Sequence, residues 1–267
     1  MSTETLEHPV VSRKEWLESR KAFLKKEKEL THLRDKLCQE RRDLPWVKVE
    51  EDYVFNGPDG KVKLSELFKG RSQLIVYHFM FDPAWEEGCP GCSFISDHVD
   101  GARQHFENRD VSYVAVSRAP LAKLEAYKKR MGWKFPWVSS GGNQFNYDYH
   151  VSFTDEQIAK GEAFYNYAPE KEAGESPGAS VFYKNDKGEM FHTYSTYGRG
   201  LEQALGTFVW MDLTPKGYKE ISHAWLFAAR ESWALPVLSR GLLYVVQNTR
   251  DVVNGVGPRL LCYDLRG

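Results

Sequence analysis

The sequence predicts an α/β protein with a central mixed sheet flanked by helices and a long helix added in front. Two observations predict the sheet: apolar strand patterns alternate with amphipathic helix patterns, and a hairpin pattern follows them. A third observation, a charged segment rich in helix formers over 12–42, predicts the added helix. We therefore expect an N-terminal helix over 1–43, a domain over 44–217 and a C-terminal tail of unclear role over 218–267.

The charged segment is typical of one long amphipathic helix. Ser12 followed by Glu15 fits a capping box, and Pro45 predicts the end of the helix because the residue before a proline avoids helical conformation. Large apolar residues recur every seven positions, at Trp16, Phe23, Leu30 and Leu37. We expect this stripe to pack on the helix's own domain. The alternative is binding to a partner, for example a homo-oligomer formed through this helix.

Strands and helices alternate through the domain. Residues 73–81 are almost continuously apolar, which predicts a central strand buried on both faces. The segment between Asn143 and Pro177 is polar and is predicted to be an insertion with a short helix near 155–161. The other predicted elements are short strands around 46–49 and 53–55, a helix over 93–109, a strand over 110–117, a helix over 120–132, a hairpin over 180–196 and a last helix over 200–213.

Composition argues against several classes of function. The formal net charge is −1, so no global field favours nucleic acid or an anionic membrane as a partner. The N-terminus lacks the apolar stretch of a signal peptide, and no run of about 20 apolar residues suggests a membrane span. We therefore expect a cytoplasmic protein that binds neither membrane nor nucleic acid.

The chain has four cysteines, and two of them, Cys89 and Cys92, lie three positions apart between the central strand and the next helix. In a reducing compartment a close pair is more often catalytic, redox-sensing or metal-binding than structural. A structural zinc site needs four ligands, and Cys38 and Cys262 are isolated in the sequence. Redox chemistry is therefore favoured over zinc, and no metal or other cofactor is expected.

Strand, short loop, cysteine pair and helix, in this order, form the arrangement of the thioredoxin fold. Cys89 would lie at the helix N-terminus, where unpaired N–H groups and the helix dipole favour the thiolate. Cys92, one turn further on, would be shielded and placed to attack a mixed disulfide. Pro90 and Gly91 separate the two, and a proline in the first helical turn costs little because its missing N–H would be unpaired there anyway.

Several blocks of sequence carry a further signal, among them GPDGKVKLSELFKGRSQLIVYHFMF, WEEGCPGCSF and FNYDYHVSF. Over about residues 10–217 the chain resembles a bacterial thioredoxin-like family of uncharacterised proteins labelled predicted dithiol–disulfide oxidoreductases. The resemblance implies the peroxiredoxin-like branch of the thioredoxin fold and redox chemistry at Cys89 and Cys92. The tail after about Lys219 departs from the family ending, so we expect it to contribute little to the redox site.

Three more residues are candidates for supporting roles. Thioredoxins have tryptophan directly before the first cysteine, whereas Gly88 stands here and Trp85 could form a wall of the same surface. Thioredoxins also carry a cis-proline that faces the dithiol, and Pro177 is the candidate for it. Arg118 follows a predicted strand, where it could bind a carboxylate, stabilise a thiolate or act as a simple cap.

Three classes of function stay open at this point. The first, which we favour, is a thiol–disulfide oxidoreductase that acts on a protein or small-molecule thiol or disulfide. The second is a thiol-dependent peroxide reductase, in which Cys89 becomes a sulfenic acid that Cys92 resolves. It ranks lower because no Thr-x-x-Cys pattern places a threonine three residues before Cys89. The third is a non-catalytic thioredoxin-like interaction module.

Overall fold

The computed structural model describes residues 8–215, 237–239, 242–247 and 259–264. The chain forms two compact units. The N-terminal helix belongs to one, and the domain that starts at Trp46 belongs to the other. The role predicted for the tail after Lys219 falls mostly outside the described residues. Its described strands form a separate three-stranded sheet of β13 (Val237–Ser239), β14 (Leu242–Gln247) and β15 (Arg259–Asp264).

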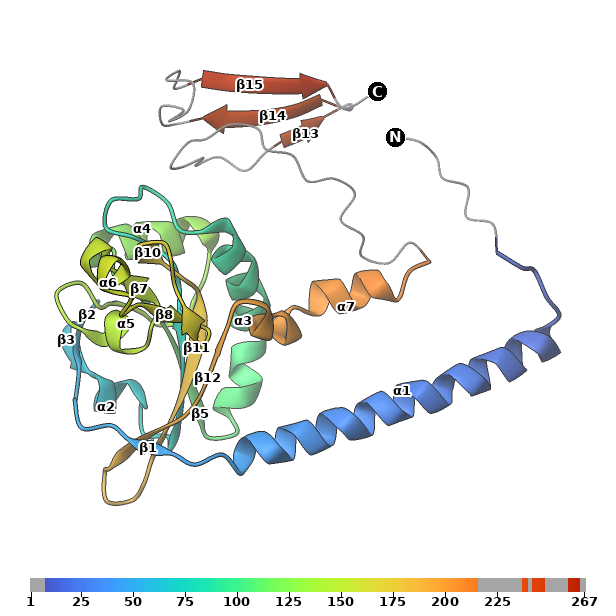
Figure 1. The fold of residues 1–267 in the computed structure, drawn as a ribbon, viewed down its shortest axis with the longest axis horizontal. Helices are drawn as coiled ribbons and strands as arrows, with labels where there is room; N and C mark the ends of the chain where they lie inside the picture. The colour runs from blue at the N-terminus through green and yellow to red at the C-terminus, as the bar shows by residue number, and fades with distance from the viewer. Residues whose placement is uncertain (1–7, 216–236, 240–241, 248–258, 265–267) are drawn as a thin grey trace. The chain divides into compact units, whose positions relative to one another are not determined.

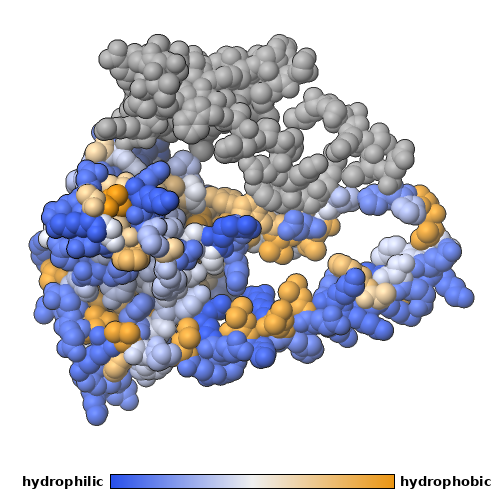
Figure 2. Space-filling model, viewed as in Figure 1, coloured by the Kyte–Doolittle hydropathy of each residue, from blue (hydrophilic) through white to orange (hydrophobic). Residues whose placement is uncertain are grey.

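The predicted N-terminal helix is α1, Arg13–Arg42. The Ser12 hydroxyl accepts the amide of Glu15 at 3.3 Å, and the Ser12 amide donates to the Glu15 carboxylate at 3.0 Å, which confirms the capping box. Helix α1 has no buried residues, and Figure 2 shows apolar side chains along it. They are Trp16, Leu17, Phe23, Leu24, Leu30, Leu33 and Leu37. Self-association through this helix stays a prediction.

The domain is built on an eight-stranded mixed sheet flanked by helices (Figure 1). The strand order is β1-β12-β11-β4-β5-β6-β2-β3. The strands are β1 (Val47–Lys48), β2 (Val54–Gly57), β3 (Gly60–Lys63), β4 (Gln73–His78), β5 (Val111–Ser117), β6 (Trp137–Ser139), β11 (Gly178–Lys184) and β12 (Met190–Tyr197). Strands β4, β5 and β6 are parallel, while β11 runs antiparallel to β4 and to β12.

The predicted thioredoxin-like fold is confirmed by this topology. Helix α3 (Pro90–Glu107) connects the parallel strands β4 and β5, and α4 (Leu121–Met131) connects β5 to β6. The antiparallel hairpin β11–β12 pairs with the other edge of β4. Strand β4 is therefore central, as the apolar run over 73–81 predicts, and the cysteine pair lies where β4 leads into α3.

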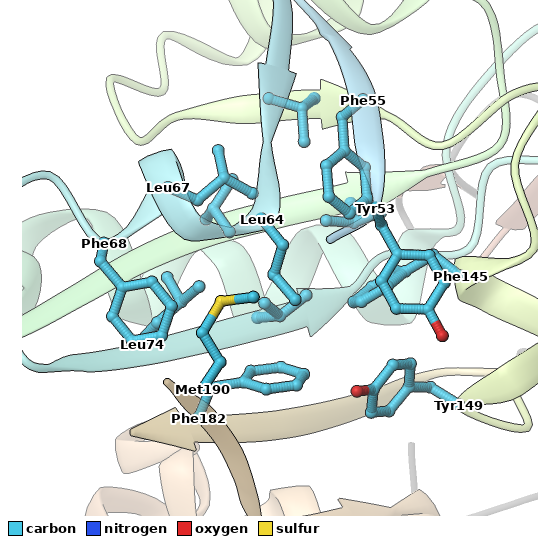
Figure 3. Packing of buried hydrophobic residues seen from close by; sticks show 14 residues of the cluster. Tyr53, Phe55, Leu64, Leu67, Phe68, Leu74, Phe145, Tyr149, Phe182 and Met190 are labelled. Carbon is cyan, nitrogen blue, oxygen red and sulfur yellow. The ribbon is translucent and has the colours of Figure 1, made fainter. Parts of the chain in front are cut away.

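Two hydrophobic cores cover the two faces of the sheet. On one face, α2 (Leu64–Leu67) and α5 (Phe145–Asp148) supply residues to a cluster that includes Phe55, Leu74 and Phe182 (Figure 3). On the other face, α3 and α4 enclose a mainly aromatic cluster. Its members include Tyr77, Phe79, Phe81, Tyr127, Trp133, Trp137 and the second cysteine, Cys92. One sulfur of the pair is therefore part of the core.

His78 ends β4 on the face opposite to α3, where its ring lies against Phe145 and Tyr149. Its Nε2 is 2.8 Å from the Ser180 hydroxyl, the first link of a hydrogen-bonded row that continues through Ser195 to His192. Burial, with a smaller effect of His192, lowers the pKa of His78 to about 3. His78 is therefore a neutral, hydrogen-bonded core histidine.

The last helix differs from the prediction. The expected continuous helix over 200–213 is divided into a 3-10 helix, η1 (Gly198–Ala204), and α7 (Gly206–Asp212). In a continuous helix the amide of Thr207 would bond to a carbonyl four residues earlier, but it donates to His98 Nε2 of α3 at 3.3 Å. Gly206, which has a low helix propensity, marks the division.

The predicted insertion contains more regular structure than its sequence indicates. The expected short helix is α6 (Asp155–Lys160), and Thr154 caps it. Two small antiparallel pairs surround it, β7 (Ser152–Phe153) with β10 (Gly174–Glu175), and β8 (Phe164–Tyr165) with β9 (Ala168–Pro169). No helix among the described residues is long and apolar enough to cross a membrane.

Candidate dithiol site

Cys89 is the N-cap residue of α3, and Pro90 is the first residue of the helix. Its side chain is half-buried, and its sulfur accepts the Cys92 thiol proton and the amides of Gly91 and Cys92. The thiol–thiol hydrogen bond is the largest cause that lowers the pKa of Cys89 to about 6, and the two amides add to it against the opposing effect of burial. At neutral pH Cys89 is therefore mostly a thiolate.

Cys92 has the opposite properties. Its side chain is 1% exposed, and the amide of Met80 donates to its sulfur at 3.4 Å. Burial raises the pKa of Cys92 well above its usual value, and the hydrogen bond to Cys89 adds to that effect. The site thus joins one accessible thiolate to one buried, protonated thiol, which are the protonation states that thiol–disulfide exchange requires.

Two tyrosines that the sequence analysis did not single out are neighbours of Cys92. The hydroxyls of Tyr77 and Tyr113 are buried, and neither has a nitrogen or oxygen partner; the Tyr77 hydroxyl contacts the Cys92 sulfur instead. Burial raises the pKa of both, and the nearby Cys92 sulfur contributes to each shift. Tyr77 stands at an inward position of the apolar strand, where a tyrosine and a phenylalanine give the same sequence pattern, so the pattern contained no signal for this role.

The loop before Cys89 explains why no tryptophan directly precedes it. A Cβ atom at Gly88 would lie 2.6 Å from Cε1 of Phe79, whose ring is 1% exposed, so no larger residue fits there. Trp85 is half-buried and packs against the aromatic core that contains Cys92. Its carbonyl accepts Lys123 Nζ at 2.7 Å, which ties this loop to α4.

Arg118 links the dithiol loop to the insertion. Its guanidinium donates to Glu175 Oε1 and to Asp82 Oδ2, each at 2.6 Å, and also to the Tyr147 hydroxyl. Burial raises the pKa of Glu175 to about 7, and the charge of Arg118 opposes that shift. All three nitrogens of Arg118 are thus engaged within the chain, an arrangement that favours a positioning role over direct substrate binding.

Pro177 lies at the same end of the sheet as the dithiol. It directly precedes β11, whose first residue, Gly178, pairs with His78 of β4. On β4's side of this pair, the amide of Met80, two residues after His78, contacts Cys92. The carbonyl of Pro177 accepts the hydroxyl of Tyr165 at 2.8 Å.

An open cavity of about 660 Å³ adjoins this end of the sheet. Its wall includes Pro83 of the dithiol loop, Arg118 and Ser139. Across the part of the chain that the structure describes, no group of three histidine, cysteine, aspartate or glutamate side chains is arranged to hold a metal ion.

The fold and the site define a thioredoxin-like protein with a cysteine pair at a helix N-terminus. The chain belongs to the family of bacterial proteins of unknown function DUF899, which matches residues 5–233. No curated protein matches the sequence.

Solved structures with similar folds have low sequence identity to the chain. A mutant of peroxiredoxin Q from Xanthomonas campestris is 14% identical to this chain, with a TM-score of 0.42. The match covers 58% of this chain and 89% of the peroxiredoxin chain. Peroxidoxin BcpB from Mycobacterium tuberculosis is 14% identical with a TM-score of 0.41, covering 61% and 94%. A putative thiol:disulfide interchange protein DsbE from Chlorobium tepidum is 15% identical with a TM-score of 0.39, covering 61% and 97%.

Proposed function

We propose that this protein is a dithiol–disulfide oxidoreductase in which Cys89 is the attacking thiolate and Cys92 the resolving thiol. The single observation that carries the proposal is the contrast within the pair: a half-buried Cys89 whose pKa is about 6 beside a fully buried Cys92 whose pKa is raised. Two buried cysteines with a purely structural role would not be expected to differ in pKa and exposure in this way. We also propose a reducing, cytoplasmic setting, which the low cysteine content supports.

The reaction has two steps. The Cys89 thiolate attacks one sulfur of a disulfide, the substrate S–S bond breaks, and the first thiolate leaves with a proton taken from water. Cys92 then gives up its proton and attacks the Cys89 sulfur, which releases the second thiol and leaves a Cys89–Cys92 disulfide. Two electrons pass from the dithiol to the substrate disulfide, and the reverse sequence oxidises a pair of thiols.

The second step needs negative charge on a buried sulfur. Burial is the largest cause of the raised pKa of Cys92, and the Cys89 thiolate is the next; loss of that thiolate in the mixed disulfide removes the second obstacle to ionising Cys92. The Met80 amide already donates to the Cys92 sulfur at 3.4 Å, and the Tyr77 hydroxyl lies beside the same sulfur; both contacts lower the pKa of Cys92. We propose that Tyr77 donates a hydrogen bond to the Cys92 thiolate as it forms.

The proposal predicts the pH at which Cys89 becomes reactive. Alkylation of the reduced protein by iodoacetamide, followed by mass spectrometry, should give a midpoint near pH 6 for Cys89. In Cys92→Ala the midpoint should rise, because the thiol that donates to Cys89 is gone. Ser93→Ala is the control, since the Ser93 hydroxyl bonds the Cys89 carbonyl and not its sulfur. A wild-type midpoint above 8, near that of an ordinary cysteine, would contradict the proposal.

A second prediction concerns Tyr77. In Tyr77→Phe the first step should be unchanged, while the release of the second thiol should slow by roughly 10- to 100-fold, since a hydrogen bond to a charged group is worth about 1.5–3 kcal/mol. Stopped-flow measurement of the two thiols released from a chromogenic disulfide separates the steps. Tyr183→Phe, which removes a hydroxyl at the far end of β11, is the matched control. Equal second-step rates in the two variants would remove Tyr77 from the mechanism.

Peroxide reduction is the alternative that the same pair allows. It needs donors that hold the peroxide beside the Cys89 sulfur, and Arg118, the cation predicted near the pair, is engaged by Glu175, Asp82 and Tyr147. This arrangement supports disulfide exchange as the better candidate. Oxidation of the reduced protein by hydrogen peroxide, compared with its oxidation by a disulfide at equal concentration, distinguishes the two.

A further inference from the structure

The backbone that leads into β11 is at the end of the sheet where β4 leads to the dithiol. Gly178, the first residue of β11, pairs with His78, the last residue of β4, two residues before Met80. Both cysteines contact Met80, because its amide donates to Cys92 and its carbonyl accepts the amide of Cys89 at 3.1 Å. An extended peptide that adds a strand next to this backbone would bring its own disulfide close to Cys89.

The chain itself already occupies that backbone. Strand β10 pairs antiparallel with β7, in the register Gly174 to Phe153 and Glu175 to Ser152. The pairing continues one residue further, where the amide of Ser176 donates to the carbonyl of Val151 at 2.9 Å. Strand β7 thus takes the place that a bound peptide strand would take.

The next residue, Pro177, closes the segment. It has no N–H to donate, and its carbonyl accepts the Tyr165 hydroxyl at 2.8 Å. The same hydroxyl accepts the amide of Gly198 at 2.9 Å, so Tyr165 ties two backbone segments together. Burial, with a smaller contribution from Cys92, raises the pKa of Tyr165 to about 12, which is consistent with a position near the dithiol.

An ion pair with a buried carboxylate holds the β7–β10 pair in place. The side chain of Glu175 is 1% exposed and accepts Arg118 Nε at 2.6 Å and the Ser152 hydroxyl at 2.9 Å. Arg118 in turn bonds Asp82 in the dithiol loop. A peptide strand could replace β7 only by breaking the backbone pairing between β7 and β10 and the hydrogen bond from Ser152 to Glu175.

We infer, on the basis of the function proposed above, that the site acts on low-molecular-weight disulfides and excludes extended polypeptide strands. A small disulfide needs only access to the half-buried Cys89 sulfur, whereas a protein disulfide must also place its flanking backbone on an edge that β7 occupies. Reduction of such a disulfide, RSSR, yields two RSH and the Cys89–Cys92 disulfide, so that atoms and electrons balance in a single turnover.

The test compares single-turnover rates of the reduced full-length protein with bis(2-hydroxyethyl) disulfide, oxidised glutathione and insulin. Each rate is divided by the rate of dithiothreitol with the same disulfide, which removes differences in intrinsic reactivity. We expect the corrected rates with the two small disulfides to exceed the rate with insulin by roughly 100-fold or more. Glu175→Gln, which weakens the contacts that hold β10, should reduce the ratio of the small-disulfide rate to the insulin rate about tenfold. The exposed control Glu172→Gln should leave this ratio unchanged.

The outcomes separate the two proposals. If insulin reacts within threefold of the small disulfides in the wild-type protein, the substrate class is wrong and the oxidoreductase function stands. If no disulfide oxidises the pair, the proposed function itself fails. The wild-type comparison decides the substrate class even if the Glu175 variant does not fold.

Discussion

Cys89→Ser should lose disulfide exchange by roughly three orders of magnitude or more, because a serine hydroxyl is not ionised at neutral pH and cannot attack sulfur. Cys92 cannot take over the first step, since its sulfur is 1% exposed and burial raises its pKa. Exchange is measured as the rate of thiol release from a chromogenic disulfide.

Cys92→Ser should behave differently. The first step survives, and the serine hydroxyl can still donate to the Cys89 sulfur as the thiol does. The second step cannot follow, so a covalent adduct between Cys89 and half of the substrate should accumulate to nearly one equivalent. Intact-protein mass spectrometry detects the adduct and its loss on addition of a reductant.

The control for both variants is a background in which Cys38 and Cys262 are replaced by serine, so that an adduct can form only at the pair. In this background Cys89→Ser should trap nothing. Equal trapping by the two single variants would mean that the cysteines are equivalent, and the assignment of attacking and resolving roles would be wrong.

Arg118→Met should destabilise the fold, and its effect should depend on pH. The substitution leaves Glu175, whose side chain is 1% exposed, with Ser152 as its remaining hydrogen-bond partner. Removing one partner of a buried pair costs about 3 kcal/mol or more. We expect a loss of that order in the free energy of unfolding at pH 8, measured by urea denaturation.

The sign of the pH dependence follows from the pKa of Glu175. In the folded wild type it is about 7, above the unfolded value near 4.5, so the folded state binds the extra proton between these pH values. This contribution to stability is present below pH 4.5 and is lost as the pH rises through 7. Without Arg118 the pKa should rise further, so the deficit of the variant should grow from pH 5.5 to pH 8.

Arg199→Met is the matched control for this experiment. Arg199 pairs with Glu202 through a side chain that is 91% exposed, so its replacement should change stability little at either pH. A deficit of Arg118→Met that is the same at pH 5.5 and pH 8 would mean that Glu175 stays ionised throughout. The raised pKa of Glu175, and the pH dependence predicted from it, would then be wrong.

Local patterns were sufficient to predict much of the fold. The apolar run over 73–81 predicts a central strand because only a strand covered on both faces can bury every residue of such a run. The capping box at Ser12 and the cysteine pair before a helical pattern are likewise short-range signals, and the structure contains both features. The position of Cys89 at the N-terminus of α3 therefore followed from residues within one turn of it.

Signals of this kind failed where distant contacts compete with local preference. The continuous helix predicted over 200–213 is divided because Thr207 donates to His98, more than 100 residues away in sequence. The prediction for the insertion contained its short helix but not its strands, because strands of two residues, such as β7 and β10, are too short to form a periodic pattern. The absence of a side chain at Gly88 follows from the Phe79 ring, which no local pattern reveals.

By itself the sequence determined the fold class, the cysteine pair and the position of Cys89 at the start of a helix, since the strand, the helix start and the three-residue spacing are short-range patterns. Only the tertiary structure decided what surrounds the pair: the tyrosine hydroxyls at Cys92, the engagement of Arg118 by Glu175 and the strand β7 that occupies the neighbouring edge. These features bring together residues that are tens of positions apart in the sequence. Their chemistry depends on burial, because excluding water from a carboxyl or thiol group changes its pKa.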